Sequence, residues 1–228
     1  MVNTITELFE EQAKLLNHGR ILDSPESAAG KVQRKIIQAA TKHFVQFGYR
    51  RASIADIASS VGIGKGTIYL HFKSKKEIFL CCQLAEEQQL LPKFKNIEKM
   101  QKKERFSAYI EASLNFATSA PLSRALLARP HDFALMLDEI GPDRIKNFTS
   151  KGNEYVAKSL INPIAQNVNT EAQIDIAKVI NIVIHAIGHL PDSVLKISNI
   201  KTENFIEIFT KILEQGTKNT KSIKSERE

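Results

Sequence analysis

The stretch "SIADIASSVGIGKGTIYLHFKSKKEIF", Ser53 to Phe79, decides the fold of this 228-residue chain. It begins with an apolar-periodic run over residues 53–60, turns at Val61 and Gly62, and continues with a second short run over residues 64–70. Ser53 and the acidic residue three positions later have the spacing of a capping box, which indicates a helix start. Two helices joined by a tight corner form a helix-turn-helix, whose second helix lies in the major groove of DNA.

The second of these helices is expected to have one buried face and one exposed face. Ile68 and Phe72 supply the apolar face, and Ile57 in the preceding helix points toward the same core. The side chains on the other face can donate to bases or phosphates, and a glycine among them lets the backbone approach closely. These residues are Lys65, Gly66, Thr67, Tyr69 and His71. Lys75, at the start of the next helix, is expected to face a phosphate.

The positive charge of the chain is concentrated around this motif. Residues 31–79 contain ten Lys or Arg and two acidic residues, a net charge of +8, whereas the whole chain has a formal charge of +7. The remainder is therefore nearly neutral. A basic block beside a nearly neutral remainder is typical of proteins that bind a polyanion. The alternative interpretation is a solvated face that keeps the protein soluble.

Helical patterns extend on both sides of the motif, and no alternating β pattern of useful length occurs. The segments over residues 4–16, 31–47 and 74–91 have helical apolar periodicity, and Gly48 is expected to end the second of them. Ser74 with Glu77, and Thr170 with the glutamine three positions on, have capping-box spacing. Further helices are expected over residues 106–118, 122–128, 133–140, 143–161, 170–190 and 205–213, the last ending before Gly216. The chain is therefore expected to be all-α.

These features together resemble the DNA-binding domain of the TetR family of bacterial transcriptional regulators. The resemblance rests on Ala39, Ala40 and Phe44 in the first helix, on the following Phe47-Gly48, and on the pieces "IA", "VGIGKGTIY", "HF" and "SKKEIF" at the family's spacing. It covers about residues 30–90. The remainder has no comparable signature, but its length and helical pattern are similar to the family's ligand-sensing and dimerisation domain.

The resemblance implies a role for each matching residue. Lys65, Gly66, Thr67 and Tyr69 match positions of the recognition helix that face bases or adjacent phosphates. Ser53, His71 and Lys75 match positions that contact the DNA backbone, and Lys31 stands where the family often touches a phosphate.

Two features depart from the family's pattern. Gly64 stands where the family often has a polar residue, commonly serine, so a side-chain contact with DNA is missing there. The segment before the first helix of the motif is about thirty residues long, which exceeds what is usual and suggests an additional arm or a docking element.

The chain is expected to contain four regions. Residues 1–29 form an N-terminal extension with a short amphipathic helix, and residues 30–90 form the DNA-binding domain, with the helix-turn-helix at 53–72. Residues 91–215 form a ligand-binding and dimerisation domain, and residues 216–228 form a disordered tail.

The segment over residues 174–190 is apolar nearly all round, so a helix there needs cover on every side. The core of the domain can cover one side, and a symmetric partner can cover the other together with the last helix, which has a similarly wide apolar stripe. We therefore expect a twofold homodimer, and a roughly palindromic operator on double-stranded DNA. The expected interface residues are Ile174, Ala177, Asn181, Phe205, Phe209 and Ile212.

A cavity for a small-molecule inducer is expected from the resemblance, in the helical C-terminal half. Aromatic residues and methionine at helical spacing also occur in ordinary cores, so plain core packing is the alternative interpretation. The candidate lining residues are Phe106, Tyr109, Phe116, Phe133, Met136, Phe148, Tyr155 and Ile184. An apolar cavity of this kind indicates a hydrophobic or amphipathic ligand.

The sequence contains no catalytic constellation, and neither an enzyme activity, a cofactor nor a metal site is expected. His185 and His189 share a helical face but have no evident third ligand. Cys81 and Cys82 are adjacent, so a bridge between them would be strained, and the cysteine content suggests a reducing compartment. The N-terminus lacks the pattern of a signal peptide, and residues 179–190 are too short to span a bilayer. A cytoplasmic protein without a membrane partner is therefore expected.

The pattern as a whole indicates a sequence-specific DNA-binding transcriptional regulator, a repressor released from its operator by a small ligand. The alternative function is a non-specific, architectural DNA-binding protein. Equal affinity for all duplexes would favour the alternative.

Overall fold

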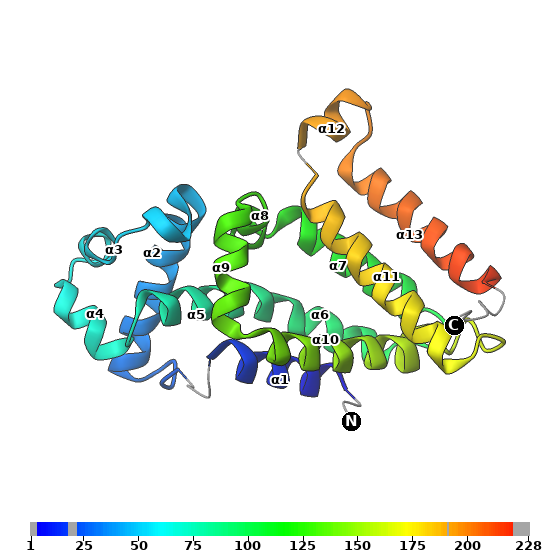
Figure 1. Ribbon diagram of the computed structural model, residues 1–228, viewed down its shortest axis with the longest axis horizontal. Helices are drawn as coiled ribbons and strands as arrows, with labels where there is room; N and C mark the ends of the chain where they lie inside the picture. Colours follow the sequence, from blue (N-terminus) through cyan, green and yellow to red (C-terminus); the bar gives the residue numbers. More distant parts are fainter. Residues whose placement is uncertain (1–3, 18–21, 191, 221–228) are drawn as a thin grey trace. The chain divides into compact units, whose positions relative to one another are not determined.

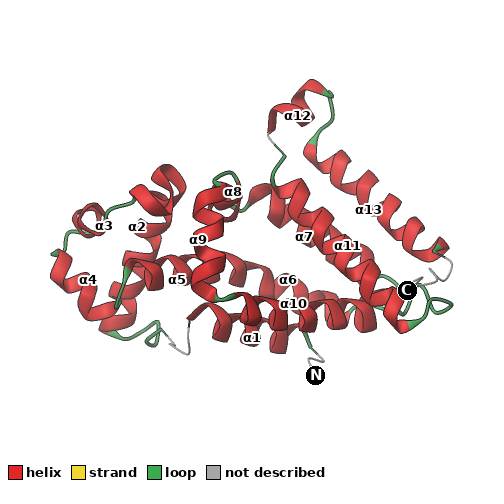
Figure 2. Cartoon of the chain, in the orientation of Figure 1, coloured by secondary structure: helices red, strands yellow, loops and turns green. Residues whose placement is uncertain are grey.

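The computed structural model describes residues 4–17, 22–190 and 192–220, and these residues form helices and loops without a β-strand (Figures 1 and 2). This confirms the expected all-α class. The α-helices are α1 (Ile5–Asn17), α2 (Ala28–Arg51), α3 (Ile54–Ser60), α4 (Lys65–His71), α5 (Lys75–Glu87), α6 (Leu91–Lys99), α7 (Arg105–Ser119), α8 (Pro121–Leu127), α9 (Pro130–Ile140), α10 (Pro142–Val156), α11 (Thr170–Gly188), α12 (Asp192–Ile197) and α13 (Thr202–Asn219). A 3₁₀ turn covers Gln88–Leu90, and a π-helical turn covers Ala157–Ile161.

The chain packs into two compact units. The first contains Met1–Phe9, Leu90–Ser119 and Asn147–Glu228, and the second contains Glu10–Gln89 and Ala120–Lys146. The second unit, here called the head unit, therefore combines α2–α5 with α8 and α9. The first is called the C-terminal unit. The expected functional division at residue 90 stays a prediction, while the packing groups α8 and α9 with the helix-turn-helix.

The core of the head unit is built from the apolar faces that the sequence pattern indicates. Ile36 and Phe44 of α2, Ile57 of α3, and Ile68 and Phe72 at α4 are each at most 1% exposed. The ring of Phe44 meets that of Phe79 edge to face, with 5.0 Å between centroids and an interplanar angle of 87°. This core holds the short helices α3 and α4, which are too short to be stable alone.

Helix α2 begins three residues before the expected start at Lys31. The hydroxyl of Ser27 caps it by accepting the backbone N–H of Gly30 at 2.9 Å. Its regular course breaks at Gly48, where φ is +77°. The break confirms the expected stop, because L-residues with a side chain rarely adopt this backbone region. One more helical turn then runs to Arg51.

Helix α5 connects the motif to α8 through a buried carboxylate. Glu86 is 5% exposed, and its two oxygens accept the backbone N–H groups of Leu122 and Ser123, each at 2.7 Å. The hydroxyl of Ser123 donates to the same carboxylate at 2.7 Å. Glu86 thus supplies the acceptors that the free N–H groups at the start of α8 require. These bonds explain why α8 packs with the head unit.

The C-terminal unit has its own core, to which α1, α6, α7, α10, α11 and α13 contribute. Phe106, Ile110 and Leu114 of α7 are fully buried, and Ile5 of α1 is 2% exposed. The ring of Phe9 lies 5.8 Å from that of Phe94. The expected N-terminal amphipathic helix is therefore confirmed over its first turns; the side chains of residues 12–17 lie outside the described residues.

Three details of the expected helices are corrected. The cap of α11 is Asn169, whose side chain accepts the N–H of Ala172 at 2.8 Å, so the expected Thr170 capping box is wrong by one residue. Helix α13 continues through Gly216 to Asn219, because a single glycine does not end a helix whose backbone bonds continue; residues 221–228 of the expected tail lie outside the described residues. Helices α6 and α12 were not expected.

Within the described part of the chain, no helix is long and apolar enough to cross a membrane.

Candidate nucleic-acid interface

The corner between α3 and α4 is fixed by a glycine-dependent C-cap. The N–H of Ile63 donates to the carbonyl of Ala58 and the N–H of Gly62 donates to that of Ser59, both at 3.1 Å. This pair of bonds is a Schellman motif, which requires a left-handed residue at its turn. Gly62 has φ of +71° and meets that requirement. The expected helix, corner and second helix are all confirmed.

Helix α4 presents one face to solvent and packs the other into the core of the head unit. Ile68 is fully buried, whereas Tyr69 is 47% exposed. The ammonium of Lys65 lies 6.0 Å from the centroid of the Tyr69 ring, one turn further along. Lys65 and Gly66 are exposed, and Thr67 and His71 are partly exposed. The structure therefore brings the predicted base-facing and phosphate-facing residues together on one accessible surface.

Leu70 belongs to the same surface and was missed by the sequence reasoning. It is 82% exposed, whereas Leu135, the next most exposed leucine among the described residues of the head unit, is 38% exposed. A signal was available, because Leu70 is out of phase with the Ile68 and Phe72 stripe. An exposed leucine beside Tyr69 offers an apolar surface to the methyl group of a thymine in the major groove.

Gly64 and Gly66 do not owe their presence to backbone strain. Gly64 is the N-cap of α4 with φ of −74°, a value that any L-residue adopts. A Cβ at Gly66 would meet nothing within 4 Å, and one at Gly64 would meet only the Thr67 hydroxyl at 4.0 Å. Within the head unit, both positions could carry a side chain. Close approach of the backbone to DNA at these two positions stays a prediction.

Several residues expected to contact the DNA backbone also have structural partners. The hydroxyl of Ser53 caps α3 by accepting the N–H of Ala55 at 3.2 Å. Lys75 donates to the carbonyl oxygens of Arg50 at 3.2 Å and Ala52 at 3.3 Å. Its ammonium also lies 4.9 Å from the ring centroid of Tyr49. Lys75 therefore holds the end of α2 against α5. Lys31 is exposed at the start of α2.

The same side of α5 is tied to α9 by a second lysine. Lys76 donates to the carbonyl of Glu139 at 2.8 Å, and its ammonium lies 3.9 Å from the carboxylate of that residue. Part of the positive charge of residues 31–79 is therefore used in contacts within the head unit.

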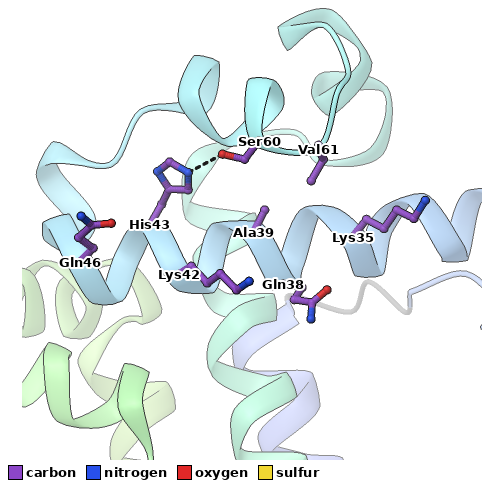
Figure 3. A pocket seen from close by; sticks show the side chains of 8 residues that line it. All are labelled: Lys35, Gln38, Ala39, Lys42, His43, Gln46, Ser60 and Val61. Atoms are coloured by element: carbon purple, nitrogen blue, oxygen red, sulfur yellow. Dashed lines mark hydrogen bonds between the residues drawn. The ribbon is translucent and has the colours of Figure 1, made fainter.

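A polar groove lies between α2 and α3 (Figure 3). It has a volume of about 530 Å³. The imidazole Nε2 of His43 lies 2.8 Å from the Ser60 hydroxyl, which donates in turn to the carbonyl of Asp56. Because that hydroxyl donates elsewhere, His43 Nε2 carries the proton in this contact. The ammonium and amide groups of Lys35, Gln38, Lys42 and Gln46 extend along α2 at the groove (Figure 3).

The predicted pocket residues are divided between the two units. Phe133 and Met136 pack against the core of the head unit. Phe106, Tyr109, Tyr155 and Ile184 contribute to the core of the C-terminal unit. Phe116 and Phe148 are partly exposed and belong to the C-terminal unit as well.

Two tyrosines of the C-terminal unit have polar or aromatic partners within the unit. The hydroxyl of Tyr155 donates to the carboxylate of Glu98 at 3.0 Å, and the N–H of Ile5 donates to the same oxygen at 2.5 Å. Burial and then the Glu98 charge raise the pKa of Tyr155. Tyr109 stacks on Phe94 at 5.3 Å, and burial raises its pKa too. Both phenols are therefore neutral at ordinary pH.

The predicted interface residues fall into three groups by exposure. Ile212 is 60% exposed, and the stacked pair Phe205 and Phe209 is partly exposed, as is Ile174. Asn181 donates to the amide oxygen of Asn153 at 2.7 Å within the same unit. Ala177 is fully buried inside its own subunit, so its assignment to an interface is wrong.

The outward apolar surface of the C-terminal unit includes residues that the sequence reasoning omitted. Val179 and Ile182 of α11 are 58% and 67% exposed, and Ile208 of α13 is 55% exposed. His185 lies further along α11, where burial and then the neighbouring His189 lower its pKa. Among the described residues, no group of three or more potential metal-ligating side chains occurs.

Comparison with known proteins agrees with this geometry. Residues 36–82 match the model of the bacterial regulatory proteins of the tetR family. The uncharacterized HTH-type transcriptional regulator YhgD of Bacillus subtilis is 47% identical over 47 residues, which are 21% of this chain and 25% of that protein. The fatty acid metabolism regulator protein of B. subtilis is 32% identical over 102 residues, 45% of this chain and 48% of that protein. The matches thus span half or less of these relatives.

Solved structures share the fold over most of the chain. A TetR-like transcriptional regulator from Rhodococcus sp. RHA1 aligns with a TM-score of 0.58 and 17% identity, over 82% of this chain and 96% of that one. The fatty acid degradation regulator FadR from Bacillus halodurans aligns with a TM-score of 0.55 and 18% identity, over 84% and 96%. Residues 36–82 thus match the DNA-binding model of the tetR family, within a fold that the chain shares with TetR-like regulators.

Proposed function

We propose that this protein is a sequence-specific DNA-binding transcriptional regulator. The observation that carries the proposal is the solvent-facing surface of α4, where Lys65, Tyr69 and Leu70 are exposed while Ile68 on the opposite face is fully buried. A rigid helix with donor and apolar side chains on one accessible face can follow the major groove and distinguish base edges.

The protein acts as a homodimer on a palindromic operator. Val179, Ile182 and Ile212 present an apolar surface on α11 and α13. A second copy covers this surface, because a C2 interface uses the same patch on both subunits. Two heads related by a twofold axis contact inverted half-sites.

A hydrophobic or amphipathic small molecule releases the repressor from DNA. The aromatic interior around Phe106, Tyr109 and Tyr155, with the Glu98 carboxylate at its edge, suits a largely apolar ligand that carries one polar group. The name of one relative, the fatty acid metabolism regulator of B. subtilis, points in the same direction. Ligand binding reduces DNA affinity if the ligand favours a dimer whose heads do not fit successive grooves.

A gel-shift titration of the full chain tests the regulatory function. The DNA is a fragment carrying the promoter of the protein's own gene or of a neighbouring gene, with a random fragment of equal length as competitor. The promoter fragment is expected to bind at least tenfold more tightly, and Lys65→Ala is expected to reduce this preference while Lys95→Ala on α6 leaves it unchanged. Equal affinity for both fragments would favour the alternative, an architectural DNA-binding protein.

A further inference from the structure

A second hollow in the head unit lies where α2 ends and α9 begins. It has a volume of about 570 Å³ and is lined by Phe47, Arg50, Arg51, Arg129, Pro130, His131 and Asp132. This set, here called the arginine notch, contains three guanidinium groups and one carboxylate. It shares no residue with the surface of α4.

The one carboxylate of the arginine notch is turned to an internal partner. Asp132 is 6% exposed, and it accepts the backbone N–H of Tyr49 at 2.7 Å. Arg129 is fixed in the wall, since it donates to the carbonyl oxygens of Ala125 and Val45, each at 3.0 Å, and to that of Gln46 at 3.3 Å. Its hydrogen-bond partners are neutral carbonyls, and the Asp132 carboxylate lies near its Nε, since a Cβ at Gly48 would lie 2.5 Å from Asp132 Oδ2 and 3.1 Å from Arg129 Nε. The free positive charge of the notch is therefore that of Arg50 and Arg51.

Three polar groups of the notch have unused donors. The side chains of Arg50 and His131 have no hydrogen-bond partner among the described residues, and Arg51 uses only its Nε, which donates to the carbonyl of Phe47 at 3.2 Å. Helix α9 has eleven residues, begins here and lacks a side-chain cap, so the positive end of its dipole faces the same place. The ring of Phe47 is 39% exposed beside these donors.

We propose that the arginine notch binds a small organic anion with a flat apolar body, such as an aromatic carboxylate. Arg50 and Arg51 hold the carboxylate by charge-assisted hydrogen bonds, His131 donates a further one, and Phe47 covers the ring. A simple inorganic anion uses the donors but leaves the phenyl surface of Phe47 in water. The site is formed by residues of the head unit alone and does not depend on DNA binding.

The test uses the full chain without DNA at constant ionic strength, with 4-fluorobenzoate as the probe and its ¹⁹F NMR line width as the readout. Saturable broadening is expected for the wild type. The double variant Arg50→Gln/His131→Gln is expected to weaken binding by at least about tenfold, because each lost charge-assisted bond contributes on this scale. Lys35→Gln/Lys42→Gln removes two cations from another face of α2 and serves as the matched control.

The outcomes separate the proposal from non-specific attraction. Loss of broadening in the notch variant alone supports the site. Equal broadening in both double variants, or none in the wild type, overturns it. Inorganic phosphate that displaces the probe at equal concentration would show that charge alone is recognised and would also overturn the proposal. Both substituted side chains are exposed, and if the double variant nevertheless fails to fold, Arg50→Gln alone is expected to weaken binding severalfold.

Discussion

The carboxylate of Asp132 accepts the backbone N–H of Tyr49 at 2.7 Å, across 83 positions of sequence. The bond forms immediately after Gly48, whose φ of +77° turns the N–H toward α9. A Cβ at position 48 would lie 2.5 Å from the carboxylate oxygen of Asp132. The left-handed backbone at Gly48 therefore allows the hydrogen bond that connects the end of α2 to the start of α9.

Gly48→Ala is expected to lower the free energy of unfolding by about 3 kcal/mol, because it adds backbone strain and also displaces Asp132. Gly62→Ala is the matched control: its φ of +71° is similarly left-handed, but a Cβ there meets nothing within 4 Å. It is expected to cost about 1 kcal/mol. Urea unfolding measures both. Equal losses would contradict the role given to the Asp132 contact.

The surface of α4 predicts two different effects on DNA recognition. Lys65→Ala is expected to weaken operator binding by about 1–3 kcal/mol and to relax the preference at one base pair. Leu70→Ala is expected to cost about 1 kcal/mol, only at half-sites with a thymine at the contacted position. Fluorescence anisotropy on a panel of single-base operator variants measures both. A uniform loss across the panel would show that neither side chain distinguishes bases.

Lys75 is expected to act mainly inside the protein. Lys75→Met removes its bonds to the carbonyls of Arg50 and Ala52 and its contact with Tyr49, so the free energy of unfolding should fall by about 1–2 kcal/mol. Lys73→Met, at an exposed neighbouring position, is the control and should leave stability unchanged. If Lys75→Met instead kept full stability and reduced the slope of log affinity against log salt by about one, its role would be a phosphate contact.

Alkaline pH is expected to destabilise the head unit because the thiol of Cys82 and the phenol of Tyr49 have raised pKa values in the folded chain. Burial raises the pKa of Cys82 from 9.0 to about 12, and burial with the charge of Glu139 raises that of Tyr49 from 10.0 to about 12. The unfolded chain loses these protons at lower pH than the folded chain, so stability is retained below pH 9 and lost as pH rises toward 12.

The free energy of unfolding is expected to fall by about 2 kcal/mol between pH 8 and pH 10.5 because of Cys82 alone. The check is urea unfolding at both pH values, comparing the wild type with Cys82→Ala and with Ile78→Val, a buried residue of the same helix without a titratable group, as control. Cys82→Ala is expected to show a smaller pH dependence of the unfolding free energy than the wild type and the control. An identical decline in all three proteins would assign the effect to other groups.

The exposed apolar surface of α11 and α13 predicts a dimer that depends on Ile182. Ile182→Glu places a charge on the proposed twofold interface and should give a monomer in sedimentation equilibrium, with operator affinity reduced at least tenfold. Ile197→Glu alters an isoleucine of α12 that is 85% exposed and is expected to leave the dimer intact. A monomeric wild type that still binds the operator tightly would exclude this arrangement.

The sequence predicted the features that depend on neighbours along the chain. The cap at Ser53, the turn at Gly62 and the buried face of Ile68 and Phe72 follow from local spacing, and the structure confirms each. Local spacing also explains one error: Asn169 and Thr170 are both good caps, and the choice between them depends on the approach of the preceding loop.

The features that sequence reasoning missed depend on residues far apart in the chain. Glu86 reaches the start of α8, and Asp132 reaches Tyr49, through contacts that no local pattern encodes. Periodicity likewise could not show which side of the nearly all-apolar α11 faces inward, so Ala177 was placed at an interface although it is buried.

Selection of bound duplexes from a random DNA pool tests the central claim most directly. The full chain is incubated with the pool at physiological salt, and the retained sequences are compared after successive rounds. Recognition by two α4 helices related by a twofold axis predicts enrichment of an inverted repeat with one half-site for each subunit, and loss of that enrichment in Lys65→Ala. A retained pool with no shared sequence would contradict sequence-specific recognition by α4.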